Sequence, residues 1–243
     1  MENNKIVKLK RDIIEDYSYS EAIKGLRTNV QYCGSNIHVI MFTSALPDEG
    51  KSDISFGLAL SMAQIGKRVV IVDADIRRSV LKDRYNVDGD IYGLTQYLTG
   101  QKSVEDIVYK TAKDNLSVVF AGPFSPNPSE LLEDKLFDEF IDTLKQSYDY
   151  VFIDTPPMAS LADGSIVARR SDGVILVIES GAISYRLEQQ VIKQIEATGT
   201  RILGAVLNKV DPKTEGYYGK YGKYGKYGKY GRYGYGQSYG GGK

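Results

Sequence analysis

The chain has 243 residues, 42% of them hydrophobic and 26% charged, and its 31 basic residues balance its 31 acidic residues. This composition suits one globular domain with an appendage, without an apolar run near the roughly 20 residues of a membrane-spanning helix and without the apolar core of a signal peptide. A single cysteine, Cys33, excludes an intrachain disulfide and fits a reducing cytosol, and a single histidine, His38, argues against a zinc site or a Ser-His-Asp triad.

The first predicted element is a helix that Ser20 would cap, because serine favours helix N-caps. Three apolar residues share one face of this helix: Ile23, Leu26 and Val30. Three charged residues recur at a spacing of three on another face: Glu21, Lys24 and Arg27. A charged ladder of this kind is usually a solvated face, and it can also be half of a subunit contact.

The next segment, 37–54, reads IHVIMFTSALPDEGKSDI and predicts a strand, a loop and a helix. The run VIMF is typical of a buried parallel strand, and apolar residues at helical spacing begin at Ile54. This is the layout of a phosphate-binding P-loop, in which backbone N–H groups and the helix dipole attract an anion. In such a loop Lys51 reaches the β- and γ-phosphates, and the Ser52 hydroxyl sits on Mg²⁺.

The loop departs from the usual pattern at several positions, and a surface turn that happens to contain Gly-Lys-Ser is the alternative. Ala45 stands where the pattern has its first glycine, and three carboxylates flank the phosphate position. We expect Asp48 and Glu49 to point outward, whereas Asp53 suits a helix N-terminus. The predicted nucleotide-binding residues of the loop are Asp48, Glu49, Gly50, Lys51, Ser52 and Asp53.

A second pair of carboxylates follows the next predicted strand. The helix 51–64 should end at Gly66, a favourable C-terminal cap, and the strand 69–72 leads into the sequence DADIRR. Ligands of parallel α/β sheets bind beyond the carboxyl ends of the strands. Asp73 and Asp75 are therefore placed for Mg²⁺ and for accepting a proton, unless the segment is only a solvated turn.

The rest of the body continues the alternation of helices and strands. Helices are expected at 93–98, 103–108, 131–146 (with a break near Asp134), 158–170 and 184–197, and strands at 116–120, 150–153, 174–178 and 202–207. Asp154 ends an apolar strand in the manner of a Walker B aspartate, which holds Mg²⁺. Asn208 opens an Asn-Lys-x-Asp sequence that runs to Asp211, a type of motif that often reads the nucleotide base.

About six strands thus alternate with helices, which predicts an α/β fold with a parallel sheet covered by helices on both faces. Three regions are expected along the chain. They are an N-terminal segment with the first helix (1–36), a nucleotide-binding domain (37–215) and a tail (216–243).

The tail reads YYGKYGKYGKYGKYGRYGYGQSYGGGK from residue 217, and its lack of aliphatic residues and its many glycines predict a disordered arm. It takes six of the 31 basic residues and none of the 31 acidic ones, so the tail carries +6 and the rest of the chain −6. Such an arm could stack on single-stranded nucleic acid, or its tyrosines could be substrates. The candidate phosphorylation sites are Tyr218, Tyr221, Tyr224, Tyr227, Tyr230, Tyr233 and Tyr235.

Together these features resemble the bacterial tyrosine kinases of capsule and exopolysaccharide synthesis, in the Gram-positive form whose kinase is a chain separate from its membrane activator. The resemblance rests on SALPDEGKS (44–52), IVDADIR (71–77), VFIDTPP (151–157), PNPSELL (126–132) and the tyrosine-rich tail. The E-x-x-K-x-x-R run from Glu21 is similar to the oligomerisation helix of that family, E-x-x-R-x-x-R, with Lys24 at the middle position.

The resemblance implies a P-loop NTPase fold of the MinD/ParA type and a kinase that uses ATP and Mg²⁺ to phosphorylate its own tail in trans. It further implies a cytoplasmic protein that a transmembrane activator recruits to the membrane, a homo-oligomeric ring (an octamer in the family), a cognate tyrosine phosphatase and no nucleic-acid partner.

The same resemblance assigns roles to individual residues. Lys51, Asp73 and Asp75 would be catalytic, with Asp73 accepting the tyrosine proton. Ser52, Asp75 and Asp154 would hold Mg²⁺, Asn208 is a candidate for the adenine, and Glu21, Lys24 and Arg27 would join subunits.

Two alternatives remain open at this stage. A partition or septum-site ATPase would be a nucleotide switch of the same fold, but its loop has a signature lysine where this chain has Leu46. A non-catalytic nucleic-acid binder could use the tail, although an acidic body repels phosphates.

Overall fold

The computed structural model describes residues 6–7, 17–79, 81–85, 87, 91–159 and 162–210. The chain divides into two units, Met1–Asn208 and Lys209–Lys243, and every helix and strand below belongs to the first unit. The candidate tyrosines of the tail, Tyr218 to Tyr235, and Asp211 lie outside the described residues.

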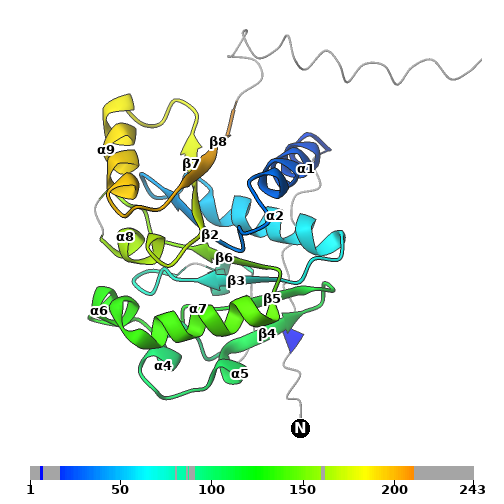
Figure 1. Ribbon diagram of the computed structural model, residues 1–243, viewed down its shortest axis with the longest axis vertical. Coiled ribbons are helices and arrows are strands. Elements are labelled where there is room, and N and C mark those ends of the chain that lie inside the picture. Colours follow the sequence, from blue (N-terminus) through cyan, green and yellow to red (C-terminus); the bar gives the residue numbers. More distant parts are fainter. Residues whose placement is uncertain are drawn as a thin grey trace, which may run out of the picture. The chain divides into compact units, whose positions relative to one another are not determined.

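A sheet of eight strands runs through the described part of the first unit, in the order β1-β4-β5-β3-β6-β2-β7-β8 (Figure 1). The strands are β1 (Ile6–Val7), β2 (Val39–Ser44), β3 (Val69–Asp73), β4 (Val108–Thr111), β5 (Leu116–Val119), β6 (Tyr150–Asp154), β7 (Gly173–Glu179) and β8 (Ile202–Asn208). The run from β5 to β8 is parallel, whereas β4 pairs antiparallel with β5, and β1 pairs parallel with β4. The six predicted strands are β2, β3, β5, β6, β7 and β8, which form this parallel run.

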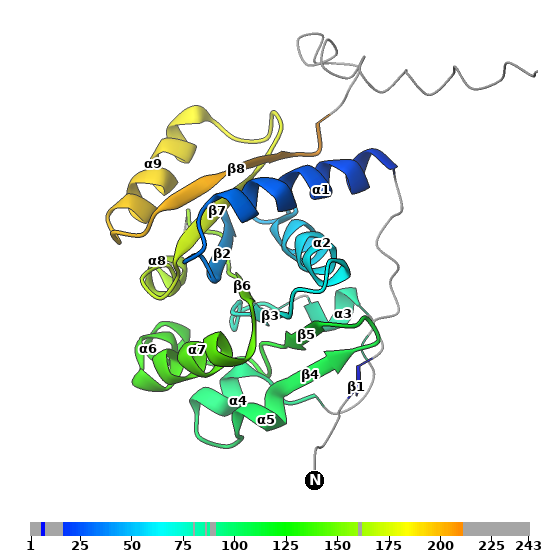
Figure 2. The same ribbon diagram turned by 45° about the vertical axis from the view of Figure 1, so that its right-hand side comes forward.

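Helices cover both faces of this sheet, as Figure 2 shows. One face carries α1 (Tyr17–Tyr32), α2 (Lys51–Gln64) and α3 (Leu81–Arg84). The other carries α4 (Leu94–Leu98), α5 (Val104–Ile107), α6 (Pro128–Glu133), α7 (Lys135–Ser147), α8 (Asp163–Ala168) and α9 (Tyr185–Glu196). The predicted α/β architecture with helices on both faces is confirmed.

The burial of β2 explains why its sequence is a continuous apolar run. Val39 and Met41 pack into the core on one face of the sheet, and Ile40 and Phe42 pack into the core on the other. All four side chains are fully buried, because a central parallel strand has no solvated face. This central place puts the loop after β2 in the middle of the carboxyl edge of the sheet.

Several predicted boundaries are wrong, for physical reasons that the structure shows. α1 begins at Tyr17, so Ser20 lies inside the helix and does not cap it. Residues 158–159 are not helical, because their backbone N–H groups donate to the carbonyls of Ser44 and Ala45, and α8 starts only at Asp163. The strands β1 and β4 were not predicted. The break at Asp134 is confirmed, since its side chain caps α7 by accepting from Leu136 N.

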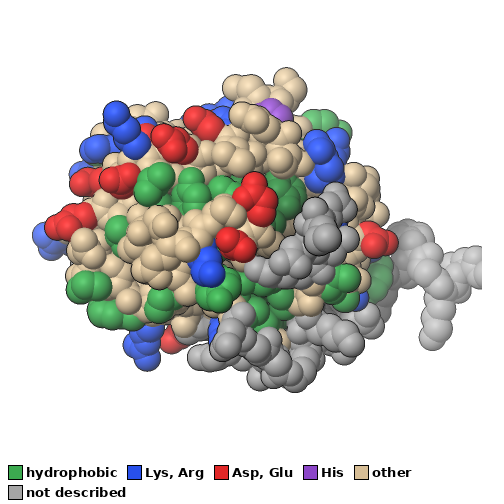
Figure 3. All heavy atoms as spheres, turned by 90° about the horizontal axis from the view of Figure 1, so that it is seen from below, with side chains coloured by type: hydrophobic (Ala, Val, Ile, Leu, Met, Phe, Trp, Pro, Cys, Tyr) green, Lys and Arg blue, Asp and Glu red, His purple; other side chains and the backbone are tan. Residues whose placement is uncertain are grey.

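Figure 3 shows acidic and basic side chains interspersed over the part of that face that is not drawn in grey. No helix within the described residues is long and apolar enough to span a bilayer.

Candidate active site

The loop between β2 and α2 is shaped by one glycine. Gly50 has φ 91° and ψ 15°, a left-handed backbone that favours glycine. A Cβ atom at Gly50 would lie 2.1 Å from Nδ2 of Asn208, which donates a hydrogen bond of 2.9 Å to the Glu49 carbonyl. Asn208, at the end of β8, thus packs directly against the loop. Ala45 is buried in the core, and its φ is not positive, so this position does not need a glycine backbone.

The prediction that Glu49 points outward is wrong. Its side chain is buried, and its carboxylate accepts hydrogen bonds from Leu46 N (2.7 Å) and Glu179 N (3.2 Å). Two backbone donors compensate the burial of this carboxylate. Glu49 therefore stabilises the loop and ties it to the end of β7, while Asp48 is exposed.

Asp53 is also engaged within the chain. Its carboxylate forms an ion pair with Arg84 of α3 (3.0 Å), and its carbonyl accepts a hydrogen bond of 3.0 Å from the Tyr19 hydroxyl. A Cβ atom at Gly57 would lie only 2.6 Å from the Tyr19 hydroxyl oxygen, so a glycine at this position allows α1 to approach α2 closely. Glu49 and Asp53 are thus both held by groups of the protein.

Asp73 and Asp154 end neighbouring strands and are direct partners in the register of β3 and β6. Both are buried, with exposed fractions of 1% and 2%. Lys51 Nζ lies 3.8 Å from Asp154 Oδ1, and this oxygen accepts no hydrogen bond within the described residues. Ser52 is buried beside Lys51, with 3.4 Å between Lys51 Nζ and Ser52 Oγ.

Burial and the nearby Asp154 carboxylate raise the pKa of Asp73 to about 7, although a hydrogen bond from Ser79 opposes the shift. Burial likewise raises the pKa of Asp154, and the Lys51 ammonium partly offsets that effect. A buried carboxyl with a pKa near neutrality can both accept and release a proton at physiological pH.

The loop after β3 contains residues for which the sequence analysis predicted no role. Ser79 Oγ donates to Asp73 Oδ2 at 2.5 Å, and Arg77 forms a paired contact with Asp163 at the start of α8. Ser129 at the start of α6 also donates to Asp163, at 2.6 Å. Arg77 lies within IVDADIR and Ser129 within PNPSELL, so the motifs contained both of these residues. No sequence signal pointed to Asp163.

The residues present fit a magnesium–nucleotide site. No group of three or more His, Cys, Asp or Glu side chains in the described ranges is placed to hold a metal alone. Mg²⁺ in nucleotide sites commonly uses one or two carboxylates together with phosphate oxygens and water. The buried Asp154 oxygen without a hydrogen-bond partner and the Ser52 hydroxyl suit that arrangement.

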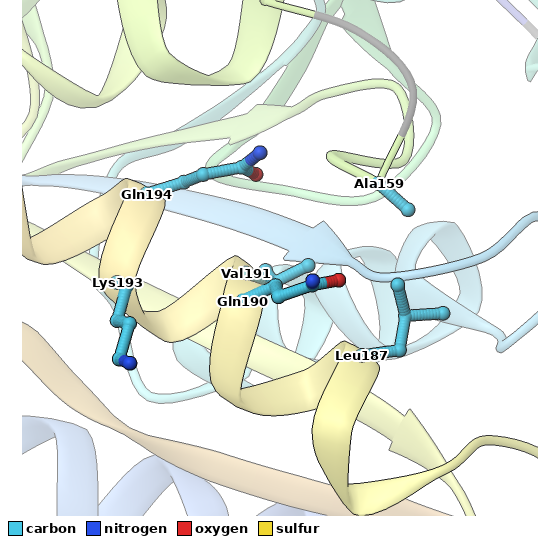
Figure 4. A pocket seen from close by; sticks show the side chains of 6 residues that line it. All are labelled: Ala159, Leu187, Gln190, Val191, Lys193 and Gln194. Carbon is cyan, nitrogen blue, oxygen red and sulfur yellow. The ribbon is translucent and has the colours of Figure 1, made fainter.

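A pocket of about 390 Å³ lies elsewhere, between α9 and Ala159 (Figure 4). Its lining residues are Ala159, Leu187, Gln190, Val191, Lys193 and Gln194. None of them belongs to the loop after β2 or to the strand ends with Asp73 and Asp154. The pocket is therefore separate from the loop after β2 and from these strand ends.

A strand, a loop with a left-handed glycine, a helix that starts at Lys-Ser and a Walker B aspartate on a neighbouring strand define a P-loop NTPase, a class that binds nucleotides. A family model described as an AAA domain matches residues 11–206. "Tyrosine-protein kinase CpsD" of Streptococcus agalactiae serotype III (strain NEM316) is 40% identical over 197 residues, which cover 81% of this chain and 85% of the relative. The chain belongs to this family of bacterial tyrosine-protein kinases, and it is a protein-tyrosine kinase.

Solved structures agree with this assignment. The chimerical protein CapA2B2 superposes with a TM-score of 0.76 at 31% identity, covering 85% of this chain and 94% of that chain. The septum site-determining protein MinD of Pyrococcus horikoshii OT3, complexed with Mg-ADP, has a TM-score of 0.61 at 24% identity and covers 70% and 69% of the two chains. The second likeness shows the fold alone. The relatives therefore favour the kinase over the nucleotide switch and over the nucleic-acid binder.

The residues predicted to join subunits lie on α1. Lys24 Nζ and Glu21 Oε1 form an exposed pair at 2.7 Å. Arg27 instead turns inward, and its Nη1 donates to the carbonyl and the hydroxyl of Ser61 on α2, both at 3.0 Å. Arg27 thus has a contact within its own chain, whatever its role between chains.

Proposed function

We propose that this kinase transfers the γ-phosphoryl group of ATP to tyrosines of the tail of a neighbouring copy. The observation that carries the proposal is the convergence of Lys51, Asp73 and Asp154 at adjacent strand ends, in a chain that also bears a tail with a tyrosine at nearly every third position. Asn208, which packs against the loop at the end of β8, is the candidate for the adenine side of the site.

In the proposed reaction the tyrosine oxygen attacks the γ-phosphorus, the bond to the ADP oxygen breaks, and the hydroxyl proton passes to the Asp73 carboxylate. The two Asp73 oxygens accept hydrogen bonds from Asp75 N (3.1 Å) and Ser79 Oγ (2.5 Å). A carboxylate oxygen has a second lone pair, so the substrate hydroxyl can share Asp73 with these donors or replace Ser79.

Lys51 and the backbone N–H groups at the start of α2 would bind the phosphates and stabilise the charge that spreads over the transferring group. Ser52, Asp75 and Asp154 would hold Mg²⁺, which would neutralise phosphate charge when bound. MinD, which shares the fold, has been solved with Mg-ADP, and this supports a magnesium–nucleotide complex here. The positions of the residues agree with these roles, since Lys51 starts the helix and Asp154 ends the neighbouring strand.

We further propose that the kinase acts in a homo-oligomeric ring joined through α1, that a transmembrane activator recruits it to the membrane, and that a tyrosine phosphatase reverses the reaction. The proposed process is the synthesis of capsule or exopolysaccharide. The support is the exposed Glu21–Lys24 pair, the likeness to the CapA2B2 chimera and the family membership.

The test is incubation with labelled ATP, with and without the cytoplasmic segments of candidate activators, followed by mapping of the labelled tyrosines. Lys51→Met should abolish labelling of the tail and keep the circular-dichroism spectrum of the folded protein, because it removes the phosphate-binding ammonium and keeps an apolar stem. Full labelling in that variant would sink the proposed role of the loop.

A further inference from the structure

A cluster of three residues, of which Asp163 is buried and the other two are partly buried, lies beside the carboxylates of the site, and we name Arg77, Ser129 and Asp163 the Arg77 cluster. Arg77 donates to Asp163 from Nε (2.5 Å, to Oδ2) and from Nη2 (3.0 Å, to Oδ1). Ser129 Oγ donates to Asp163 Oδ1 at 2.6 Å and accepts from Arg77 Nη2 at 3.1 Å. The cluster joins three segments that are far apart in the sequence: the loop after β3, the first turn of α6 and the first residue of α8.

The cluster fixes the place of Arg77. Asp163 is 1% exposed, and a buried carboxylate that loses its cation is strongly unfavourable. Burial alone would raise the pKa of Asp163, but the hydrogen bonds from Arg77 and Ser129 hold that pKa below its usual value. Two parallel N–H···O bonds also fix the plane of the guanidinium, which a single contact would not do.

Backbone hydrogen bonds of the same loop connect the position of Arg77 to Asp75 and Asp73. Arg78 N donates to Asp75 Oδ1 at 2.9 Å, and Asp75 N donates to Asp73 Oδ1 at 3.1 Å. At the start of the loop, Ala74 N donates to the Asp154 carbonyl at 2.8 Å. The loop is thus held at one end by β6 and at Arg77 by the cluster, and Asp75 lies between these two anchors.

We propose that Arg77 and Asp163 are positioning residues of the kinase reaction, which hold the 74–79 loop so that the Asp75 carboxylate faces the metal and phosphate position. The proposal rests on the proposed function, because it takes Asp75 as a residue that holds Mg²⁺. Neither Arg77 nor Asp163 touches the reacting groups, and both act through Asp75.

The test measures the affinity of the purified full-length kinase for fluorescently labelled ADP, once with Mg²⁺ and once with EDTA. The ratio of the two affinities reports how well the protein couples metal to nucleotide, and it does not depend on catalysis. In Arg77→Gln the ratio should fall about tenfold, as is usual when a residue behind a metal ligand is lost. Arg77→Lys keeps the charge but loses the paired hydrogen bonds to Asp163, so its ratio should lie between those of the wild type and Arg77→Gln. Affinity in EDTA should stay at the wild-type value in both variants.

The matched control is Arg170→Gln, which breaks another arginine–aspartate ion pair, between Arg170 Nε and Asp138 on α7, neither of which belongs to the 74–79 loop or to the Arg77 cluster. Its ratio should equal that of the wild type even if its melting temperature falls. Asp75→Asn should lower the ratio at least as much as Arg77→Gln does. If Arg77→Gln or Arg77→Lys lowers the melting temperature and keeps the wild-type ratio, the cluster is purely structural and the positioning role is wrong.

The failure of the proposed function would look different. A wild-type ratio of one, or a ratio that Asp75→Asn leaves unchanged, would overturn the role of Asp75 in metal binding, and the positioning role with it. A wild-type ratio that Asp75→Asn lowers and both Arg77 variants preserve would overturn the positioning role alone.

Discussion

At the scale of single residues, the most informative group is the buried carboxyl of Asp73. Its pKa is raised to about 7, above the value of an unfolded chain, mainly by burial and by Asp154. Between about pH 4 and pH 7 the folded protein therefore keeps a proton on Asp73 that the unfolded chain has released. The stability that this proton contributes is fully present below about pH 4 and is lost as the pH rises through 7.

In the protein without metal or nucleotide, we expect Asp73→Asn to lose less stability than the wild type as the pH rises from 4 to 8, because an amide does not ionise. Above pH 7 the variant should be more stable than the wild type, by a few kcal/mol at most, and the difference should shrink toward pH 4. Melting curves in EDTA between pH 4 and pH 8 measure this. A difference that stays constant over that range would mean that Asp73 does not titrate there. The same variant should also lose phosphorylation of the tail.

Two glycines with left-handed backbones give a second prediction at this scale. Gly50→Ala meets both a strained φ of 91° and the Asn208 amide, which must move away from the Glu49 carbonyl. Gly66→Ala meets a similar strain at φ 82° but has open space around it. Both should lose about 1–3 kcal/mol of stability. Only Gly50→Ala should also lose affinity for ADP, measured by the binding of the labelled nucleotide. Equal affinities in the two variants would contradict a role for Asn208 and Gly50 in shaping the loop.

At the scale of elements, α1 lies along α2, with Tyr19 at Asp53 in the first turn of α2 and Arg27 at Ser61 in its last turn. A triple alanine change at Glu21, Lys24 and Arg27 would therefore mix two effects, loss of a subunit contact and loss of a contact within the chain. The double change of Glu21 and Lys24 separates them, because both residues are exposed and pair only across one helical turn.

We expect the double alanine variant to sediment as a smaller species than the wild type and to keep its melting temperature. Arg27→Ala alone should lower the free energy of unfolding by about 1–2 kcal/mol, and with it the melting temperature, since two hydrogen bonds to Ser61 are lost. Sedimentation and thermal melting on the same samples check this. A wild type that is monomeric under all nucleotide conditions would show that the charged face of α1 is only solvated.

The strands β2, β3, β5, β6, β7 and β8 were predictable because each is a mainly apolar run. The site followed because Asp73 and Asp154 end such runs and Lys51 starts the helix after one. β4 was missed because its sequence, VYKT, has four residues and follows directly on α5, so the pattern gives no boundary between them. The inward turn of Glu49 depends on the Glu179 N–H, which is remote in sequence. Asp163 was missed for the same reason, since only the fold brings it to Arg77.

At the scale of the whole molecule, charge is divided between body and tail. The tail carries +6 by composition, and each phosphotyrosine adds about −1.5 to −2 charges at pH 7. Four phosphates would bring the tail to about 0 to −2, and attraction to an acidic body would become repulsion.

We expect assembly to weaken as phosphorylation proceeds, and to depend on the number of phosphates more than on their positions. Variants that keep two, four or six of the tail tyrosines, fully phosphorylated and sized by light scattering, test this. Salt should reduce the effect, because exposed charges are screened beyond about 10 Å at 0.1 M. Control of assembly by one tyrosine regardless of number would require a specific docking site instead.

The strand order also has a consequence for how the protein is made. β2 and β3 are neighbours in the sequence but not in the sheet, where β6 lies between them and pairs with both. During synthesis, two strands whose side chains are wholly buried in the finished protein must leave the ribosome before their common partner exists. Pairings so distant in sequence form slowly, and the waiting strands expose apolar surface and open edges. A nascent chain that stops before Tyr150 should therefore depend on chaperones to stay in solution and should bind no nucleotide, although it already contains the whole P-loop.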